Sequence, residues 1–350
     1  METSMRFINQ KHQQSGLAML KPKCGYQVIL ALVVFISICI VSVQSITDVG
    51  TVSVNPQSTF RRNFWSTADA DHYKLYEDGE VAELVLDQLA ASGFASNTRY
   101  LFGRIGIQMK LHPGDSAGTV TTFYTSSLSG KHDELDFEFL GNEAGKPYVL
   151  QTNVYAAGVG DREQRIKLWF DPTADFHNYT IHWNKKMIVF MVDETPIRVY
   201  KNNEDLGVPY PSKQPMSVFA SLWNGEEWAT QSGAIRLNWA KAPFGARYQS
   251  YDVQGCEVPW YKGEVGPCIS SASDGMLERA TIQNLNVEQL VRLQWVTENM
   301  VVYDYCTDIY RYPDPHPECS RNSGLQDSSS DFEANDSLSS TNSGDASSSW

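Results

Sequence analysis

The sequence lacks an excess of positive charge. Among its 350 residues, 28 lysines and arginines stand against 41 aspartates and glutamates, which gives a formal net charge of −13. Proteins that bind nucleic acids use lysine and arginine to neutralise phosphates and to release counterions. The charge balance therefore argues against a nucleic-acid partner, whereas a neutral polysaccharide is compatible with it.

Cysteine is also scarce, and the six cysteines include none between Cys39 and Cys256. No pair has the Cys-x-x-Cys spacing of a metal site, and we predict neither a metal ion nor a cofactor. The last four cysteines form an even set, as expected for disulfides in an oxidising compartment. Among the three connectivities that four cysteines permit, we favour Cys256–Cys268 with Cys306–Cys319, because short loops close most easily.

One long apolar run lies near the N-terminus, from Val28 to Val43, with basic residues before it and Gln44 and Ser45 after it. It is slightly long for the apolar part of a signal peptide and slightly short for a membrane span. We predict that residues 1–45 form a signal peptide or, alternatively, an uncleaved membrane anchor. Both interpretations place the rest of the chain outside the cytosol.

No long amphipathic helix interrupts the sequence between about Val52 and Phe244. Short segments rich in β-forming residues, such as 82–86 and 187–192, are separated by turn residues such as Pro113-Gly114-Asp115. This spacing is typical of a β-sandwich. We therefore predict an all-β sandwich domain over residues 46–250.

The pattern changes towards the C-terminus. Asn286 can cap a helix over residues 287–298, which would present Leu290, Val291 and Trp295 on one side, and a strand-like segment follows at 300–305. Residues 251–319 are too few for a core of their own, so we predict an extension packed on the sandwich. Residues 320–350 are rich in serine and acidic residues and are predicted to be disordered.

Acidic and apolar residues alternate strictly from Glu134 to Phe139. Successive side chains of a strand point to opposite faces of the sheet. The apolar residues of this segment would face the core, and Glu134, Asp136 and Glu138 would share the opposite, cleft-facing surface. Three like charges in one row repel one another and raise at least one pKa.

That arrangement suits glycoside cleavage. A retaining glycosidase needs one ionised carboxylate as nucleophile and one protonated carboxyl group as acid, about 5–5.5 Å apart. Glu134 and Glu138 can supply this pair. We assign Asp136 the role of orienting Glu134, while its charge helps to keep Glu138 protonated. A solvated acidic strand face and a calcium site remain alternatives at this point.

The whole segment from His132 to Asn142 closely resembles the signature of plant xyloglucan endotransglucosylase/hydrolases, a branch of glycoside hydrolase family sixteen. Leu135 stands where isoleucine is commoner. The resemblance extends from about Ser58 to Cys319. Further matching blocks are Tyr100-Leu101-Phe102-Gly103, Ser116-Ala117-Gly118-Thr119-Val120, Gln151-Thr152-Asn153-Val154, Asp161-Arg162-Glu163-Gln164, Leu168-Trp169-Phe170-Asp171-Pro172 and Tyr305-Cys306-Thr307-Asp308.

The resemblance implies a curved β-jelly roll similar to that of legume lectins, with the glucan on its concave face and a C-terminal extension on the acceptor side. It implies that Glu134 is the nucleophile and Glu138 the general acid/base. The expected activity is retaining cleavage of the β-1,4-glucan backbone of xyloglucan and transfer to another xyloglucan chain end. Donor and acceptor polysaccharides are the implied partners, and no stable protein partner is implied.

The resemblance also implies a set of sugar-binding residues, since most of these side chains can pair with hydroxyl groups and a tryptophan can stack on a sugar ring. The expected contacts are Gln151, Thr152, Asn153, Asp161, Arg162, Glu163, Glu227, Trp228, Ser232 and Arg311. The last four belong to the acceptor side. Here Gln231-Ser232-Gly233 replaces the family's commoner Arg-Gly-Gly, so that a serine side chain stands at position 232.

The usual glycosylation sequon after the catalytic strand is absent, because Asn142-Glu143-Ala144 occupies its place. We predict a glycan at Asn178, and Asn335 begins a second sequon. No insertion lengthens the loop between Trp228 and Trp239. The resemblance associates a longer loop with hydrolysis and therefore implies transfer here. The predicted location is the cell wall or apoplast. The alternatives are hydrolysis of xyloglucan or mixed-linkage β-glucan, and carbohydrate binding in the wall without catalysis.

Overall fold

The computed structural model describes residues 60–260, 265–270 and 273–322. The predicted N-terminal segment 1–45, Cys24, Cys39, the second sequon at Asn335 and nearly all of the predicted tail lie outside these residues. Within the described ranges, no helix is both long and apolar enough to cross a membrane.

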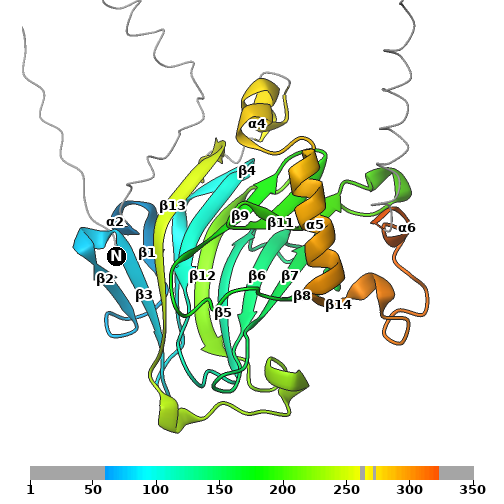
Figure 1. Ribbon diagram of the computed structural model, residues 1–350. Helices are drawn as coiled ribbons and strands as arrows, with labels where there is room; N and C mark the ends of the chain where they lie inside the picture. Colours follow the sequence, from blue (N-terminus) through cyan, green and yellow to red (C-terminus); the bar gives the residue numbers. More distant parts are fainter. Residues whose placement is uncertain (1–59, 261–264, 271–272, 323–350) are drawn as a thin grey trace, which may run out of the picture. The chain divides into compact units, whose positions relative to one another are not determined.

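Antiparallel strands that hydrogen-bond into one continuous sheet dominate the described chain (Figure 1). The strands are β1 (Phe64–Ser66), β2 (Tyr73–Tyr76), β3 (Val81–Leu86), β4 (Ser92–Lys110), β5 (Thr119–Ser126), β6 (Glu134–Leu140), β7 (Val149–Tyr155), β8 (Gln164–Lys167), β9 (His177–Trp183), β10 (Met187–Val192), β11 (Thr195–Lys201), β12 (Met216–Asn224), β13 (Phe244–Val258) and β14 (Val301–Asp304). The helices are α2 (Phe60–Asn63), α3 (Gly266–Ile269), α4 (Asp274–Ala280), α5 (Val287–Asn299) and α6 (Cys319–Asn322).

Strand β4 belongs to two layers. Its first half pairs with β1 and β12, and its second half pairs with β9 and β13. The backbone changes direction at Phe102 and Gly103, whose φ angles are 67° and 149°. A Cβ atom at Gly103 would lie 2.6 Å from the Cα atom of Gly255, so the close approach of β13 requires a glycine here.

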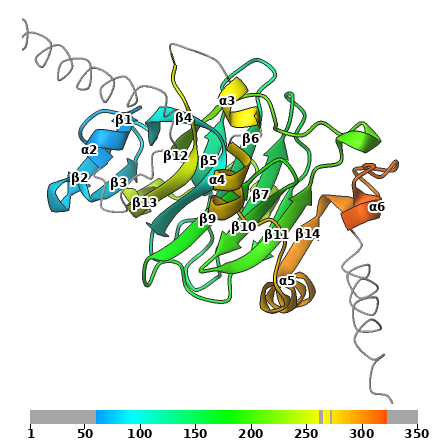
Figure 2. The ribbon, with the colours of Figure 1, turned by 90° about the horizontal axis from the view of Figure 1, so that it is seen from above.

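The sheet therefore folds into two layers that share β4. One layer has the order β1, β4, β12, β5, β6, β7, β8 and β14, and the other has the order β11, β10, β9, β4, β13, β3 and β2. Figure 2 looks along this arrangement, with β1 at the left and β7 and β14 further to the right. This organisation confirms the predicted β-sandwich.

The two layers meet through the apolar face of β6. The ring of Phe137 lies 5.2 Å from that of Phe190 on β10, and the ring of Phe139 lies 4.7 Å from that of Tyr179 on β9. Leu135, Phe137 and Phe139 are fully buried. The alternation in the sequence thus correctly predicted which side of β6 faces the core, and it leaves the acidic residues on the other side.

Helix α5 begins as predicted. The side chain of Asn286 accepts a hydrogen bond from the backbone N–H of Gln289, and the Gln289 side chain accepts one from the backbone N–H of Asn286. Each side chain satisfies a backbone donor that the first turn would otherwise leave unpaired, as in a capping box.

The predicted apolar face of α5 was only partly correct. Leu290 is half-buried, but Val291 and Trp295 are 62% and 41% exposed, whereas Leu293 and Val296 are buried. Because α5 contacts β11, the orientation of the helix on the sheet decides which stripe is buried. The sequence of α5 carries apolar residues in both stripes and does not distinguish them.

The C-terminal extension is continuous with the sandwich. Strand β14 pairs with β8, and the predicted boundary at residue 250 falls inside β13. Disulfides join Cys256 on β13 to Cys268 on α3, and Cys306 to Cys319 on α6. This is the connectivity that the short loops predicted. The first bond ties α3 to the end of β13, and the second closes a loop within the extension.

Candidate active site

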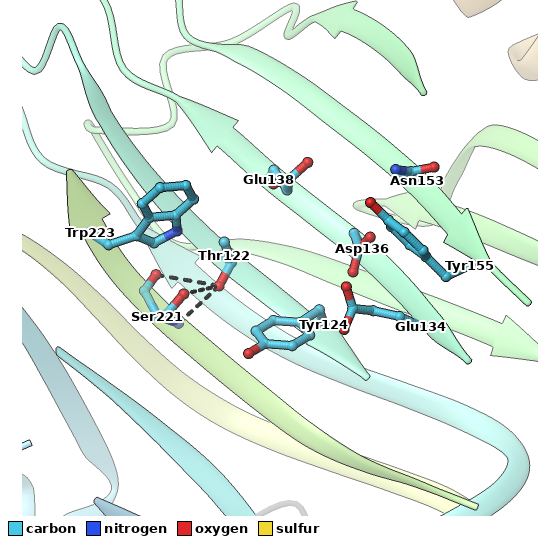
Figure 3. Close-up of a pocket in the computed structure, with 9 residues that line it drawn as sticks. All are labelled: Thr122, Tyr124, Glu134, Asp136, Glu138, Asn153, Tyr155, Ser221 and Trp223. Carbon is cyan, nitrogen blue, oxygen red and sulfur yellow. Dashed lines mark hydrogen bonds between the residues drawn. The ribbon is translucent and has the colours of Figure 1, made fainter. Parts of the chain in front are cut away.

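Three carboxyl groups of β6 share one face of the first layer. Glu134, Asp136 and Glu138 alternate with the buried apolar residues of the strand and line a pocket of about 190 Å³ (Figure 3). The lining residues are Thr122, Tyr124, Glu134, Asp136, Glu138, Asn153, Tyr155, Ser221 and Trp223. The strand arrangement therefore brings the predicted carboxyl row to an accessible surface.

Neighbouring strands complete the floor of the pocket through direct cross-strand pairing. On β5, Tyr124 lies opposite Asp136 and Thr122 lies opposite Glu138. Thr122 lies opposite Ser221 of β12 in turn, and their hydroxyl oxygens are 2.7 Å apart (Figure 3). Residues directly opposite one another point to the same face of a sheet. The carboxyl row is thus flanked by a phenol and two hydroxyl groups.

Asp136 and Glu134 share a hydrogen bond between their carboxyl groups, which requires a proton on one of them. Asp136 is almost completely buried. Its burial raises its pKa well above the usual range, and the negative charges of Glu134 and Glu138 raise it further. We therefore place the proton on Asp136, which donates it towards Glu134.

The surroundings of Glu134 have opposing effects on its pKa. Burial raises the pKa of Glu134, while a hydrogen bond from Ser126, the electrostatic influence of His132 and a hydrogen bond from Asp136 lower it. The nearest His132 nitrogen is 4.0 Å from a Glu134 oxygen. Donors directed at Glu134 favour its ionised form, which is the form a nucleophile needs.

Burial is also the largest cause of the raised pKa of Glu138. The charge of Glu134 raises this pKa further, and a hydrogen bond from Gln151 lowers it. The sequence-based prediction had assigned the helpful negative charge to Asp136. The charges that raise the pKa of Glu138 are those of Glu134 and Glu163, while burial raises the pKa of Asp136 well above its usual range.

The predicted contacts Gln151, Thr152 and Asn153 are consecutive residues of β7, so their side chains point alternately to the two faces of the sheet. Gln151 lies opposite Glu138 and donates a hydrogen bond to it, and Asn153 lines the pocket. Thr152 points to the core side, where its hydroxyl oxygen accepts a hydrogen bond from Nη1 of Arg198 at 2.9 Å. The Thr152 side chain is therefore not placed to reach a ligand in the pocket.

The predicted contacts Asp161, Arg162 and Glu163 lie between β7 and β8, and their side chains also have different surroundings. Arg162 is buried, and its Nε atom lies 2.7 Å from Oε1 of the buried Glu318. Asp161 and Glu163 instead face Arg311, with nitrogen to oxygen distances of 2.7 Å and 3.1 Å. The structure thus joins three predicted contacts into a solvent-accessible ionic cluster and places Arg162 in an internal ion pair.

The predicted acceptor-side loop follows β12. Trp228 is half-buried, and its ring centroid lies 6.1 Å from that of Trp223, which lines the pocket. Glu227 and Ser232 are exposed, and Ser232 has a φ of 57°. Trp228 therefore borders the pocket through Trp223, while neither Glu227 nor Ser232 is among the pocket-lining residues.

Two comparisons with family models cover most of the described chain. Residues 60–241 match glycosyl hydrolases family 16, and residues 271–319 match the xyloglucan endo-transglycosylase (XET) C-terminus. The chain belongs to glycosyl hydrolase family 16. The carboxyl row of β6 lies within the part of the chain that matches the family.

Within family 16, the chain is similar in sequence to proteins named as xyloglucan endotransglucosylases. Xyloglucan endotransglucosylase protein 34 of Populus tremula x Populus tremuloides is 50% identical over 262 residues, which are 75% of this chain and 88% of the relative. Probable xyloglucan endotransglucosylase/hydrolase protein 6 of Arabidopsis thaliana is 50% identical over 270 residues, 77% of this chain and 90% of the relative. These similarities confirm the family resemblance found in the sequence.

Among solved structures, the Bacillus licheniformis β-glucanase matches with a TM-score of 0.46 and 21% identity over 59% of this chain and 98% of that chain. The family assignment rests on the sequence comparisons.

Several pocket residues of this family 16 chain were not predicted. They are Thr122, Tyr124, Tyr155, Ser221 and Trp223. Tyr155 lies opposite Glu134, and its ring stacks on that of His132 with centroids 5.0 Å apart. The alternation within one strand indicates which of its residues share a face. The sequence does not show which strands are neighbours, so it could not bring residues of β5, β7 and β12 together.

The remaining site predictions concern a glycan and metal ions. Asn178 lies on β9, where its half-buried amide donates a hydrogen bond to Oγ1 of Thr180 at 3.2 Å. The glycan at Asn178 stays a prediction. In the parts of the chain that the structure describes, no group of three or more histidine, cysteine, aspartate or glutamate side chains is arranged to hold a metal ion.

Proposed function

We propose that the chain is a xyloglucan endotransglucosylase. The observation that carries the proposal is the carboxyl row of β6, in which Asp136 donates to Glu134 while burial and the charge of Glu134 raise the pKa of Glu138. One carboxyl group is thereby favoured as a nucleophile and another as an acid. Membership of family 16 and the similarity to the named transglucosylases support this assignment.

The reaction proceeds in two displacements. Glu138 donates its proton to the glycosidic oxygen while a Glu134 oxygen forms a bond to the anomeric carbon and the bond to the leaving chain breaks. Glu138, now ionised, then accepts a proton from the hydroxyl group of an incoming chain end, whose oxygen displaces Glu134. Each displacement inverts the anomeric carbon, so the new bond has the original configuration.

Acceptor binding occurs on the β8 and β14 side of the carboxyl row. Gln151 and Asn153 face the pocket beside β6, and the cluster of Asp161, Glu163 and Arg311 lies further in the same direction, where β14 pairs with β8. Charged and amide groups at these positions can pair with sugar hydroxyls. Glu227, Trp228 and Ser232 contribute from the loop after β12, which packs at the C-terminal end of β6, where Oγ1 of Thr230 donates to the carbonyl oxygen of Gly141 at 2.7 Å.

The enzyme acts outside the cell, in the plant cell wall. The two disulfides fit an oxidising compartment, and residues 1–45 direct the chain there as a signal peptide or anchor. The sandwich forms the catalytic domain, and the extension after β13 lengthens its acceptor side. Asn178 carries the glycan. Xyloglucan is both donor and acceptor, and the reaction needs no cofactor.

A transfer assay tests the proposal. Labelled xyloglucan oligosaccharide is mixed with xyloglucan polymer and protein, and both the label incorporated into polymer and the new reducing ends are measured. Incorporation without a matching rise in reducing ends is expected. Reducing ends without incorporation would identify a hydrolase. If neither product forms from xyloglucan, cellulose or mixed-linkage glucan, the catalytic proposal is wrong and a carbohydrate-binding role remains.

A further inference from the structure

The surface of the pocket continues across the sheet to its edge strand. Asp136 lies opposite Tyr124 on β5, which lies opposite Phe219 on β12. Phe219 lies opposite Ala95 on β4, and Ala95 lies opposite Trp65 on β1. Directly opposite residues point to the same face, so Trp65 faces the same side of the sheet as Asp136. Figure 2 shows the strands that carry this row.

The neighbours of Trp65 support this orientation. Phe64 is buried, and its ring lies 4.8 Å from that of the core residue Phe94. Because successive residues of a strand alternate between faces, Trp65 must point away from that core. Its side chain is 52% exposed. The indole is not part of the buried core cluster, and its exposed side is open to a ligand.

The row that ends at Trp65 is largely aromatic. The rings of Tyr124 and Phe219 stack with centroids 5.1 Å apart and an interplanar angle of 20°. Ala95, with only a methyl group, separates Phe219 from Trp65. Isolated exposed apolar residues are common on protein surfaces and do not by themselves indicate a binding site. Trp65 differs from them because it ends a row that begins at the carboxyl groups.

A second row runs parallel to the aromatic one and is polar. Glu138 lies opposite Thr122, and Thr122 lies opposite Ser221. Ser221 lies opposite Gly93, at which an added Cβ atom would approach Oγ1 of Thr67 to 2.8 Å. Hydroxyl groups therefore follow one row from β5 to the chain after β1, while aromatic rings follow the other. A polysaccharide offers both hydroxyl groups and apolar ring faces.

We propose that Trp65 is a remote donor subsite that stacks on a sugar ring of the β-1,4-glucan backbone. Four strand spacings separate β1 from β6, which amounts to about 19 Å at ~4.8 Å each. The subsite is thus several sugar rings from the cleavage point. It lies on the side of β6 opposite to Arg311, so its assignment to the donor rests on the proposed function.

Donor length tests the subsite, with kinetics of the full chain on two donors and one acceptor. One donor is xyloglucan polymer, and the other is a short activated oligosaccharide that occupies only the positions adjoining the carboxyl groups. Trp65→Ala should lower kcat/KM for the polymer, relative to that for the short donor, by about ten-fold, mainly through KM. Trp65→Tyr should retain most of the preference for the polymer.

Trp295→Ala is the matched control, because Trp295 is a similarly exposed tryptophan but lies on α5, which packs on β11. It should leave the ratio of the two kcat/KM values unchanged. An unchanged ratio in Trp65→Ala would overturn the subsite. An equal loss on both donors with a lower Tm would also overturn it, because Trp65 would then serve the fold.

Affinity electrophoresis in gels that contain xyloglucan or mixed-linkage β-glucan separates this proposal from the proposed function. If the wild-type protein is retarded and Trp65→Ala less so, the subsite stands even when the wild type transfers no label. If both are retarded equally, the subsite is refuted, whatever the wild type catalyses. If neither glucan retards the wild type, the subsite is refuted together with the function.

Discussion

Gln151 donates a hydrogen bond from its side-chain amide to the carboxyl group of Glu138, directly opposite it on the neighbouring strand. The amide oxygen of Gln151 accepts a hydrogen bond from Nε of Arg165 at 2.8 Å, which holds the amide nitrogen towards Glu138. A donor favours the ionised carboxylate and therefore lowers the pKa of Glu138, against the larger effect of burial.

Removal of this donor should move the basic limb of the pH–rate profile. In Gln151→Leu, burial acts on Glu138 without the opposing hydrogen bond, so the pKa of Glu138 should rise and the basic limb of kcat/KM should shift to higher pH. Gln108→Leu, which removes an amide bonded to Gln249 in the other layer, is the control. A shift to lower pH, or none, would contradict the role of Gln151.

Azide distinguishes the two glutamates. Glu134→Ala and Glu138→Ala should each nearly abolish turnover of xyloglucan. With an activated donor, azide needs no general base, so it should partly rescue Glu138→Ala and yield the β-glycosyl azide. With Glu134→Ala it should take the nucleophile's place and yield the opposite anomer. Product analysis by NMR decides, and exchanged anomers would reverse the two assignments.

Asp136 should act as a donor to Glu134. Asp136→Asn keeps a side-chain donor, whereas Asp136→Leu keeps the approximate volume without one. We expect both changes to lower kcat, but less completely than loss of either glutamate, and the leucine variant to lose more. The leucine variant should also have its acid limb at higher pH, because Glu134 without its donor has a higher pKa. Equal profiles in the two variants would argue against donation.

Burial of Glu138 should reduce stability at neutral pH. Its folded-state pKa is raised above the unfolded value of about 4.3. Between these two pKa values the folded state binds more protons than the unfolded state, so the free energy of unfolding falls as the pH rises. Glu138→Gln should therefore increase the free energy of unfolding at pH 7 and have little effect below pH ~4. Urea unfolding at both pH values measures this. Glu288→Gln, at an exposed position, should change little at either pH.

Arg311 and Trp228 should influence the choice between sugar and water as acceptor. Arg311→Ala or Trp228→Ala should lower transfer by about ten-fold at subsaturating acceptor, while the burst of intermediate on an activated donor changes much less. The ratio of reducing ends to incorporated label should rise. Arg321→Ala, which removes an arginine equally exposed but paired with Asp205, is the control. An equal fall in both products would place these residues outside the acceptor site.

Local chemistry explains which predictions from the sequence were confirmed. The alternation from Glu134 to Phe139 placed the carboxyl row on one face because steric constraints force a period of two on any strand. The cap at Asn286 and the two disulfides also depend on residues close together in the chain. Such features follow from the backbone and from loop closure, whatever the rest of the fold.

Only the tertiary structure decided which distant residues meet. The same alternation that Glu134 obeys turns Thr152 to the core, but the sequence of β7 does not show which of its faces looks into the pocket. Strand pairing aligns Trp65 with Asp136, although 71 positions separate them in the sequence. Burial, which depends on every neighbouring strand, raises the pKa of Asp136 well above its usual range. Register and desolvation are properties of the assembled sheet, and for that reason the sequence alone could name the carboxyl groups but could not assign their protonation or their remote partners.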